Sequence, residues 1–249
     1  MAYELGRPGH GERVYELLSE RCGVGSETSV LEVGPGTGQV TRRLLELGTT
    51  SLVALEPDPA LAAHLRRSLG AAVEVRETTL EDARIATGSF DLAVAASSFH
   101  WVVEDRGLEQ LFDALRARGW LAMWWTLFGV PGEPDEFVTA TSPLLDALEA
   151  SPSRGQAGRP RYALDTEARL AALQTAGFRE LRHEVVRWSA RWDAKGIRAL
   201  HRSFSPIARL PEDSRDHLLD EIARIAREEF GNRVERTLLT SIYTARRPS

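Results

Sequence analysis

The first half of the chain alternates between two spacings of hydrophobic residues. Short apolar runs with the length and β-branched content of buried strands lie at 29–33, 51–55, 72–76 and 90–95. Between them, apolar residues recur every three or four positions, as on one face of a helix, in segments such as 37–47 and 58–70. This alternation predicts a parallel sheet that is covered by helices on both faces.

Turn chemistry places several boundaries. Asp58 followed by Pro59 predicts an N-cap and the first position of a helix. A later helix that carries Leu108 and Leu115 is expected to end at Gly119, with a fifth strand at 120–125.

The pattern is weaker after residue 126. The expected elements are a helix near 141–150, a helix between Asp165 and Gly177, a strand near 179–188, a helix between Pro211 and Gly231, and a strand near 234–245. Because we find no internal repeat and no clear linker, residues 1–249 are expected to form a single domain. Its cofactor-binding half would be about 5–126, and lid and substrate elements would lie at about 127–163 and 190–230.

Composition restricts the partners. The net charge is −5 and the pI about 5.8, so no basic field is expected to attract nucleic acid or an anionic membrane. The apolar stretch at 119–130 is shorter than the about 20 residues that a membrane span needs. One cysteine, Cys22, and the lack of a signal-peptide pattern make a cytoplasmic location the default expectation. All but one of the 31 cationic residues are Arg, the exception being Lys195.

Residues 31–40 read LEVGPGTGQV, a glycine-rich turn directly after the first strand. A dinucleotide-binding turn would need a third glycine at Gln39, and a Walker phosphate loop would need a Gly-Lys-Ser/Thr ending that the segment lacks. Glu56 follows the second strand, twenty residues after Gly36, where its carboxylate can accept hydrogen bonds from both hydroxyls of a ribose. The predicted ligand therefore contains a ribose but no pyrophosphate.

Four motifs in this order resemble one known family. VLEVGPGTGQVT, ALEPDP, ETTLEDARIATGSFDLAVAASSFHWV and LRARGWLAMWW are similar to segments of the class I S-adenosylmethionine-dependent methyltransferases, and within them to the type 11 group, which includes trans-aconitate and quinone-biosynthesis methyltransferases. The resemblance covers about 5–126 well and the remainder loosely. It implies an α/β fold with a doubly wound, mostly parallel, seven-stranded Rossmann-like sheet and helical lid insertions. It also implies S-adenosyl-L-methionine as cofactor.

The same resemblance assigns roles to residues that would contact the cofactor. The backbone of the turn would lie against its methionine and ribose portions, and side chains or backbone groups would bind its amino group, ribose, adenine, methionine end and carboxylate. The turn consists of Gly34, Gly36 and Gly38. Glu32 would bind the amino group and Glu56 the ribose, and Pro57, Asp58, Leu80 and Glu81 would lie beside the adenine. Ser97 would face the methionine end, and Arg7 would bind the carboxylate.

Some of these roles have plain alternatives. Many relatives have Asp where this chain has Thr79, which leaves the contact with the adenine amino group open. Glu81 could be a solvated loop acid. Arg7 could cap a helix or pair with a surface acid instead of binding the cofactor carboxylate.

Methyl transfer from a sulfonium requires mainly that the acceptor be held in line with the S–C bond. His100, just after the fourth strand, is the candidate catalytic base, and its alternative role is to shape the pocket beside Trp101. Trp101 and Trp125, with Arg202 and Ser205, are the candidate acceptor-binding residues. On an alternating strand Trp124 and Trp125 point to opposite sides, so only one of them should line the pocket. The histidines show no metal-binding spacing, so no metal is expected.

The expected partner is a small-molecule methyl acceptor, with the chain as a monomer or homodimer and without nucleic acid or membrane. A nucleic-acid methyltransferase is disfavoured because SSFH follows the fourth strand, in place of the Asp/Asn-Pro-Pro-Tyr/Phe tetrapeptide typical of DNA amino-methylating enzymes. A regulatory module that binds the cofactor without transferring its methyl group remains the alternative from a different class.

Overall fold

The computed structural model of the chain describes residues 6–146, 148 and 161–249. Contacts divide the chain into two compact units. The first unit consists of Met1–Gly9, Leu127–Tyr162 and Arg187–Leu239, and the second of His10–Thr126, Ala163–Val186 and Thr240–Ser249. The single-domain organisation expected from the sequence stays a prediction.

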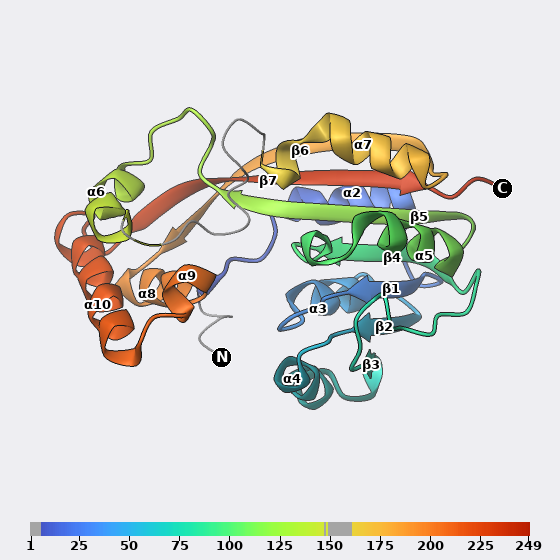
Figure 1. The fold of residues 1–249 in the computed structure, drawn as a ribbon, viewed down its shortest axis with the longest axis horizontal. Coiled ribbons are helices and arrows are strands. Elements are labelled where there is room, and N and C mark those ends of the chain that lie inside the picture. Colours follow the sequence, from blue (N-terminus) through green and yellow to red (C-terminus); the bar gives the residue numbers. More distant parts are fainter. Residues whose placement is uncertain (1–5, 147, 149–160) are drawn as a thin grey trace. The chain divides into compact units, whose positions relative to one another are not determined.

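One seven-stranded sheet has the strand order β3-β2-β1-β4-β5-β7-β6 (Figure 1). The strands are β1 (Ser29–Val33), β2 (Ser51–Leu55), β3 (Glu74–Arg76), β4 (Phe90–Ala96), β5 (Leu115–Phe128), β6 (Arg179–Trp192) and β7 (Val234–Arg246). The first five pair in parallel, with Val30 opposite both Leu52 and Leu92. Arg118 N donates to Arg247 O and Gly129 N donates to Thr237 O, so β7 runs antiparallel to β5. The predicted mostly parallel Rossmann-like sheet is confirmed, with one antiparallel strand added.

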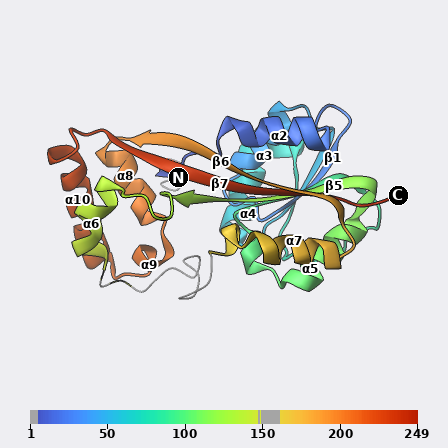
Figure 2. The ribbon, with the colours of Figure 1, turned by 90° about the horizontal axis from the view of Figure 1, so that it is seen from above.

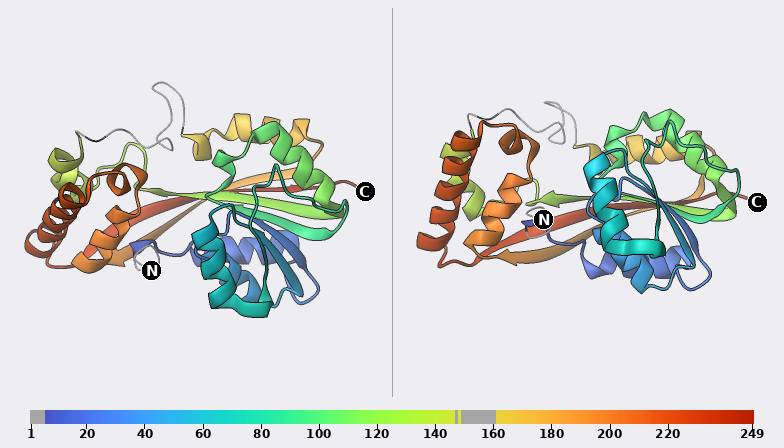
Figure 3. Two further views of the ribbon diagram at one scale, coloured as in Figure 1. Left: turned by 60° about the horizontal axis from the view of Figure 1, so that its bottom comes forward. Right: turned by 90° about the horizontal axis from the view of Figure 1, so that it is seen from below.

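Helices cover both faces of the sheet in the second unit. As Figures 2 and 3 show, α2 (Glu12–Cys22), α3 (Gln39–Glu46) and α4 (Pro59–Leu69) lie on one face, and α5 (Glu104–Ala114) and α7 (Thr166–Thr175) on the other. The predicted cap of α4 is confirmed, because Asp58 Oδ1 accepts the backbone N–H groups of Ala60 and Leu61. All five residues of β1 are buried, as expected for a strand covered on both faces.

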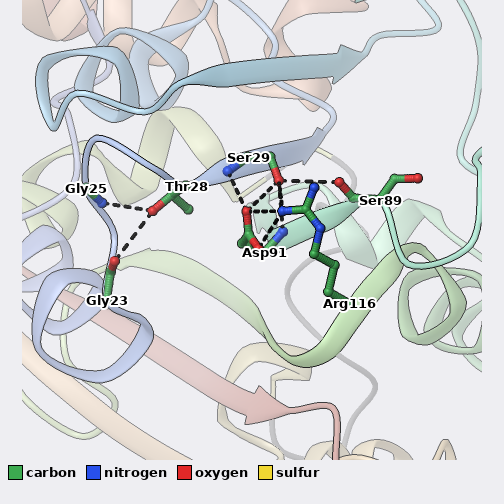
Figure 4. A network of polar contacts seen from close by, with 7 residues as sticks. All are labelled: Gly23, Gly25, Thr28, Ser29, Ser89, Asp91 and Arg116. Carbon is green, nitrogen blue, oxygen red and sulfur yellow. Dashed lines mark hydrogen bonds and ion pairs between the residues drawn. The ribbon is translucent and has the colours of Figure 1, made fainter. Parts of the chain in front are cut away.

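The amino-terminal ends of the central strands are joined by a polar network (Figure 4). Asp91, in β4, accepts hydrogen bonds from the backbone N–H and the hydroxyl of Ser29, in β1, at 2.9 and 2.6 Å. Arg116 Nη1, at the start of β5, lies 2.7 and 2.6 Å from the two Asp91 carboxylate oxygens. Burial raises the pKa of Asp91, but the hydrogen bonds from Ser29 and the ion pair with Arg116 outweigh it and lower that pKa overall.

Several predicted boundaries were wrong. The helix expected to end at Gly119 ends at Ala114, because Leu115 pairs with Phe90 and extends β5 over Leu115–Phe128. The strand expected from residue 72 begins at Glu74, after a 3₁₀ turn over Gly70–Ala72.

The second half of the chain required similar corrections. The helix expected near 141–150 is α6 (Glu136–Leu145), because Asp135 Oδ1 accepts the backbone N–H of Val138 and caps the helix early. The strand expected to end near 188 continues to Trp192. Residues 149–160 of the predicted lid range lie outside the described residues, and the lid itself stays a prediction.

The first unit contains four helices in its described part: α6, α8 (Ala194–Arg202), α9 (Ser205–Ala208) and α10 (Glu212–Glu228). The apolar faces of α6, α8 and α10 share a buried cluster around Phe137, Trp192, Ile197, Leu200 and Leu238. Lys195 is an exposed residue of α8 in this unit, whereas Cys22 ends α2 in the second unit. Among the described residues, no helix is long and apolar enough to cross a membrane.

Candidate functional site

The glycine-rich turn lies at the carboxyl-terminal ends of β1 and β2, in the second unit. Gly34 N donates to Leu55 O at 2.9 Å, and Gly38 N donates to Pro35 O at 2.9 Å. Gly34 and Gly36 have φ of 66° and 60°, in the left-handed region that favours glycine. A Cβ on Gly34 would lie 2.6 Å from Ser98 Cβ, whereas a Cβ on Gly36 would meet nothing within 4 Å. The backbone at Gly36 is therefore open to a ligand.

Glu56 connects this turn to the end of β2. Its Oε2 accepts the backbone N–H of Gly36 and its Oε1 accepts that of Asp58, each at 3.0 Å. An ionised carboxylate has about four lone-pair directions, so both oxygens retain acceptor capacity. Burial raises the pKa of Glu56, the two backbone hydrogen bonds lower it, and the charge of Asp58 raises it further; the net direction is upward. The geometry brings the predicted ribose-binding carboxylate to the predicted turn.

Glu32 lies in β1 and is 1% exposed. Burial raises the pKa of its carboxyl to about 7; the nearby Thr41 hydroxyl opposes this rise, and the charge of Glu56 adds to it. Its Oε2 has no hydrogen-bond partner among the described residues. A buried carboxylate oxygen without a donor favours a cation or a hydrogen-bond donor beside it, because the unpartnered charge carries a large desolvation cost.

The chain turns sharply after β4. Ser97 has φ of 54°, which is uncommon for a residue with a side chain, and its N–H donates to Trp124 O at 2.7 Å. The Ser98 hydroxyl donates to Val33 O and so joins the end of β4 to the end of β1. The turn directs the following residues, including His100, to the carboxyl-terminal end of the sheet.

The residues predicted beside adenine lie on neighbouring loops of the same unit. The side chain of Asp58 caps α4, and Pro57 precedes it. Leu80 is buried, and Glu81 Oε1 accepts the backbone N–H of Val103 at 3.0 Å. Glu81 thus connects the loops after β3 and β4 and is not simply a solvated acid. The adenine-binding roles stay predictions.

His100 lies between two tryptophans with different environments. Trp125 is buried, and its Nε1 donates to His100 Nδ1 at 3.1 Å. Trp101 is 69% exposed, with its ring centroid 5.0 Å from that of His100. Burial lowers the pKa of His100. Trp125 is the one of the pair that faces His100, whereas the ring of Trp124 contacts that of His10 edge to face.

Three predicted site residues belong to the first unit. Arg7 Nε donates to Ser203 Oγ at 3.0 Å, and its guanidinium lies 5.5 Å from the Phe204 ring centroid. Arg202 Nη1 lies 3.2 Å from Asp216 Oδ1, and Ser205 begins α9. Their proposed contacts with cofactor or acceptor stay predictions.

Two features of the site were missed from the sequence. They are the hydrogen bond from the Ser98 hydroxyl to Val33 O and the hydrogen bond from Trp125 to His100, and each joins residues far apart in the chain. The Trp125–His100 hydrogen bond could have been predicted from the strand order. Strands β4 and β5 pair in parallel with Ala96 opposite Trp124, so the residues that follow Ala96 and Trp124 are neighbours. No group of three or more His, Cys, Asp or Glu side chains suited to a metal occurs in the described part of the chain.

Comparison with known proteins gives a consistent result. Residues 30–119 match a family described as a methyltransferase domain. An uncharacterised methyltransferase of Schizosaccharomyces pombe is 25% identical over 98% of this chain and 93% of its own length. Among solved structures, a candidate type II methyltransferase from Anaeromyxobacter dehalogenans is similar with a TM-score of 0.66 and 22% identity, covering 97% of this chain and 98% of that one. A phosphoethanolamine N-methyltransferase from Haemonchus contortus, solved with S-adenosylhomocysteine, is similar with a TM-score of 0.57 and 13% identity, covering 97% of this chain and 54% of that one.

Proposed function

We propose that this chain, a class I S-adenosylmethionine-dependent methyltransferase, transfers the methyl group to a small-molecule acceptor. The observation that carries the proposal is the arrangement at the ends of β1 and β2: a partnerless buried carboxylate oxygen on Glu32, the open backbone of Gly36, and Glu56 fixed between two loops. A ligand with an ammonium group and a vicinal diol fits this set of donors and acceptors.

The chain's own residues would hold the cofactor by these groups. Glu32 would be paired with the ammonium group of the methionine portion, which would restore its ionised form. Glu56 would accept hydrogen bonds from the ribose hydroxyls while still bonded to Gly36 and Asp58. Gly36 would allow close approach, because no Cβ stands between its backbone and the ligand.

When bound, S-adenosylmethionine supplies an electrophilic methyl group on sulfur. The protein's remaining task is to place the acceptor atom about 3–3.5 Å from that methyl group and in line with the S–C bond. The exposed ring of Trp101 beside His100 offers an apolar surface with a polar group next to it. Such a surface suits a small organic acceptor. The acidic pI of about 5.8 provides no general attraction for nucleic acid.

Titration calorimetry on the full chain tests the cofactor. We expect binding of S-adenosylmethionine and S-adenosylhomocysteine and no binding of NAD or ATP, and tight NAD binding would contradict the proposal. Glu56→Ala is the negative control, because it removes the ribose acceptor together with its hydrogen bonds to Gly36 and Asp58.

Transfer of a radiolabelled methyl group tests the acceptor class. The protein is incubated with labelled S-adenosylmethionine and, separately, with the small-molecule, protein and nucleic-acid fractions of a cell extract. We expect label in the small-molecule fraction alone. Label in nucleic acid would identify the competing enzyme class, and cofactor binding without transfer to any fraction would indicate a regulatory module.

A further inference from the structure

The hydrogen bond between Trp125 and His100 fixes which imidazole nitrogen carries a proton. Trp125 Nε1 and His100 Nδ1 are 3.1 Å apart, within normal hydrogen-bond distance. An indole N–H donates and cannot accept. His100 Nδ1 must therefore be the acceptor, with its lone pair directed at the indole and no proton of its own.

The charge state of the ring follows from its environment. Burial lowers the pKa of His100 below its ordinary value, so the imidazole is neutral at pH 7. A neutral imidazole carries one proton. Because Nδ1 accepts from Trp125, that proton is on Nε2.

We infer that Trp125 is a positioning residue that holds His100 in its Nε2–H tautomer, so that His100 donates a hydrogen bond to the methyl acceptor and does not remove a proton from it. This inference rests on the proposed function, because it assigns a role within the same acceptor site. The indole of Trp125 is buried, which keeps the tautomer fixed by excluding water as a competing donor.

A base role would require His100 to accept a proton at Nδ1. That nitrogen faces the indole N–H, so protonation would set two donors against each other and lose the hydrogen bond. The nitrogen with a lone pair is thus directed at the indole of Trp125, and the single proton of the neutral ring is on Nε2.

This tautomer limits the class of methyl acceptor. Without a base at His100, the attacking atom must bring a free lone pair to the site, as an oxygen anion or a neutral amine does, and of these an Nε2–H donor suits the oxygen anion. In the transfer, the acceptor oxygen forms a bond to the methyl carbon as the S–C bond breaks. The electron pair of that bond stays on sulfur as a neutral thioether, and no proton moves. The exposed Trp101 ring, tilted 41° to the His100 ring, would contact an apolar part of the same acceptor.

Nuclear magnetic resonance of the full chain with ¹⁵N-labelled histidine, saturated with S-adenosylhomocysteine, tests the tautomer directly. The six histidines give few ring signals, and His100→Gln identifies the one that belongs to His100. We expect a single neutral tautomer with the proton on Nε2 at pH 7. Trp125→Phe should abolish this preference and give a mixture of tautomers. A wild-type ring that is charged, or protonated on Nδ1, would overturn the inference, as would an unchanged tautomer in Trp125→Phe.

Trp124→Phe is the matched control for that substitution. Trp124 is the neighbouring buried tryptophan, and its Nε1 donates to no group in the described structure. The variant loses the same ring volume from the same strand, so His100 should keep its Nε2–H tautomer. Equal changes in both variants would show that loss of packing, and not of the hydrogen bond, controls the ring.

Two substitutions of His100 then separate donor from base in the transfer assay. Gln keeps an N–H donor and Ala does not. With the small molecule that accepts label, we expect His100→Gln to keep kcat/KM within about tenfold of wild type and His100→Ala to raise KM about ten- to a hundredfold, with kcat within about tenfold. A loss of about 10²–10⁴ in kcat for both variants would restore the general base. Failure to bind S-adenosylmethionine would instead reject the proposed function, while the tautomer would remain measurable.

Discussion

The two ends of the strands in the second unit place a carboxylate in opposite surroundings. At the amino-terminal ends, Asp91 is surrounded by donors from Ser29 and Arg116, and its pKa is lowered. At the carboxyl-terminal ends, Glu32 is more deeply buried, one of its oxygens has no donor among the described residues, and its pKa is raised to about 7. One carboxylate has its donors within the protein, and the other has an oxygen without a donor in the described structure.

Positive φ values occur at both ends of these strands, and at the amino-terminal ends they include Gly88 and Arg118. The carboxyl-terminal ends contain Gly34, Gly36 and the non-glycine Ser97, all with positive φ. Conformations of this kind cost free energy and persist where the surrounding structure fixes them, often at binding sites. The comparison teaches that two carboxylates of the same sheet differ in the direction of their pKa shift according to the donors around them.

The largest expected effect concerns Glu32 and pH. Its pKa in the folded state is about 7 against an ordinary value of 4.5, so its contribution to stability is fully present below pH 4.5 and is lost as the pH rises through 7. The shift corresponds to roughly 3 kcal/mol. We expect the unfolding free energy of the ligand-free wild type, measured relative to Glu32→Gln, to fall by that amount between pH 4 and pH 8. Parallel curves in urea titrations would contradict the assignment.

Glu56→Ala should weaken cofactor binding more than it slows methyl transfer. Two charge-assisted hydrogen bonds are lost, each contributing about 1.5–3 kcal/mol. The dissociation constant for S-adenosylmethionine should rise roughly ten- to a few hundredfold, since tenfold is about 1.4 kcal/mol. Titration calorimetry measures this, and Glu56→Gln, which keeps the shape and part of the acceptor capacity, should lose less. An unchanged constant in Glu56→Ala would remove this residue from the ribose site.

A substitution at the amino-terminal ends of the strands should lower the free energy of unfolding and leave cofactor binding unchanged. Asp91→Asn loses the ion pair with Arg116 and weakens the bonds from Ser29, at a cost of about 1–2 kcal/mol after allowing for partial exposure. Because the pKa of Asp91 is lowered, its contribution is present above its ordinary value of 3.8 and is lost as the pH falls below it. The difference between variant and wild type should therefore shrink in acid.

A control for Asp91→Asn is Glu77→Gln, which breaks the exposed pair with Arg66 and should cost less than about 1 kcal/mol. Cofactor affinity should stay at the wild-type value in both variants. A large loss of affinity in Asp91→Asn would show that the two ends are coupled.

The change in stability expected for Gly36→Ala is about as large as that for Asp91→Asn. An alanine with left-handed φ costs about 1–2 kcal/mol, and its Cβ would meet no protein atom within 4 Å. Gly23→Ala is the matched control, because Gly23 also has positive φ, of 66°, and open space around it. Thermal unfolding should show similar losses for both, whereas only Gly36→Ala should lose cofactor binding. Equal affinity in the two variants would separate Gly36 from the ligand.

Sequence reasoning predicted the parallel part of the fold because its signals are local. The run at 29–33 is apolar apart from Ser29 and Glu32, and Asp58 with Pro59 specifies a helix start within two residues. The predicted helix end at Gly119 was wrong, because a glycine can end a helix or lie in a strand. The pairing between Leu115 and Phe90 places Gly119 in β5. Helix α6 was misplaced because its start depends on Asp135, whose second oxygen also binds Arg236, a hundred residues away.

In the candidate site too, the features with local signals were predicted and those that depend on the folded sheet were not. Glu56 and Gly36 were predicted as a pair because their spacing along the chain reflects two consecutive strands. The missing donor at Glu32 and the partner of His100 could not be predicted, since both depend on which side chains the folded sheet brings together.

The distribution of Lys195 and Cys22 has a practical consequence. The chain has one lysine side chain, exposed on α8 in the first unit, and one thiol, at the end of α2 in the second. Amine-reactive and thiol-reactive dyes would therefore each attach to one side chain without mutagenesis, although burial raises the pKa of the Cys22 thiol to about 12 and will slow its reaction. With the terminal amine blocked, energy transfer between the two dyes would report on any movement between the units when cofactor and acceptor bind.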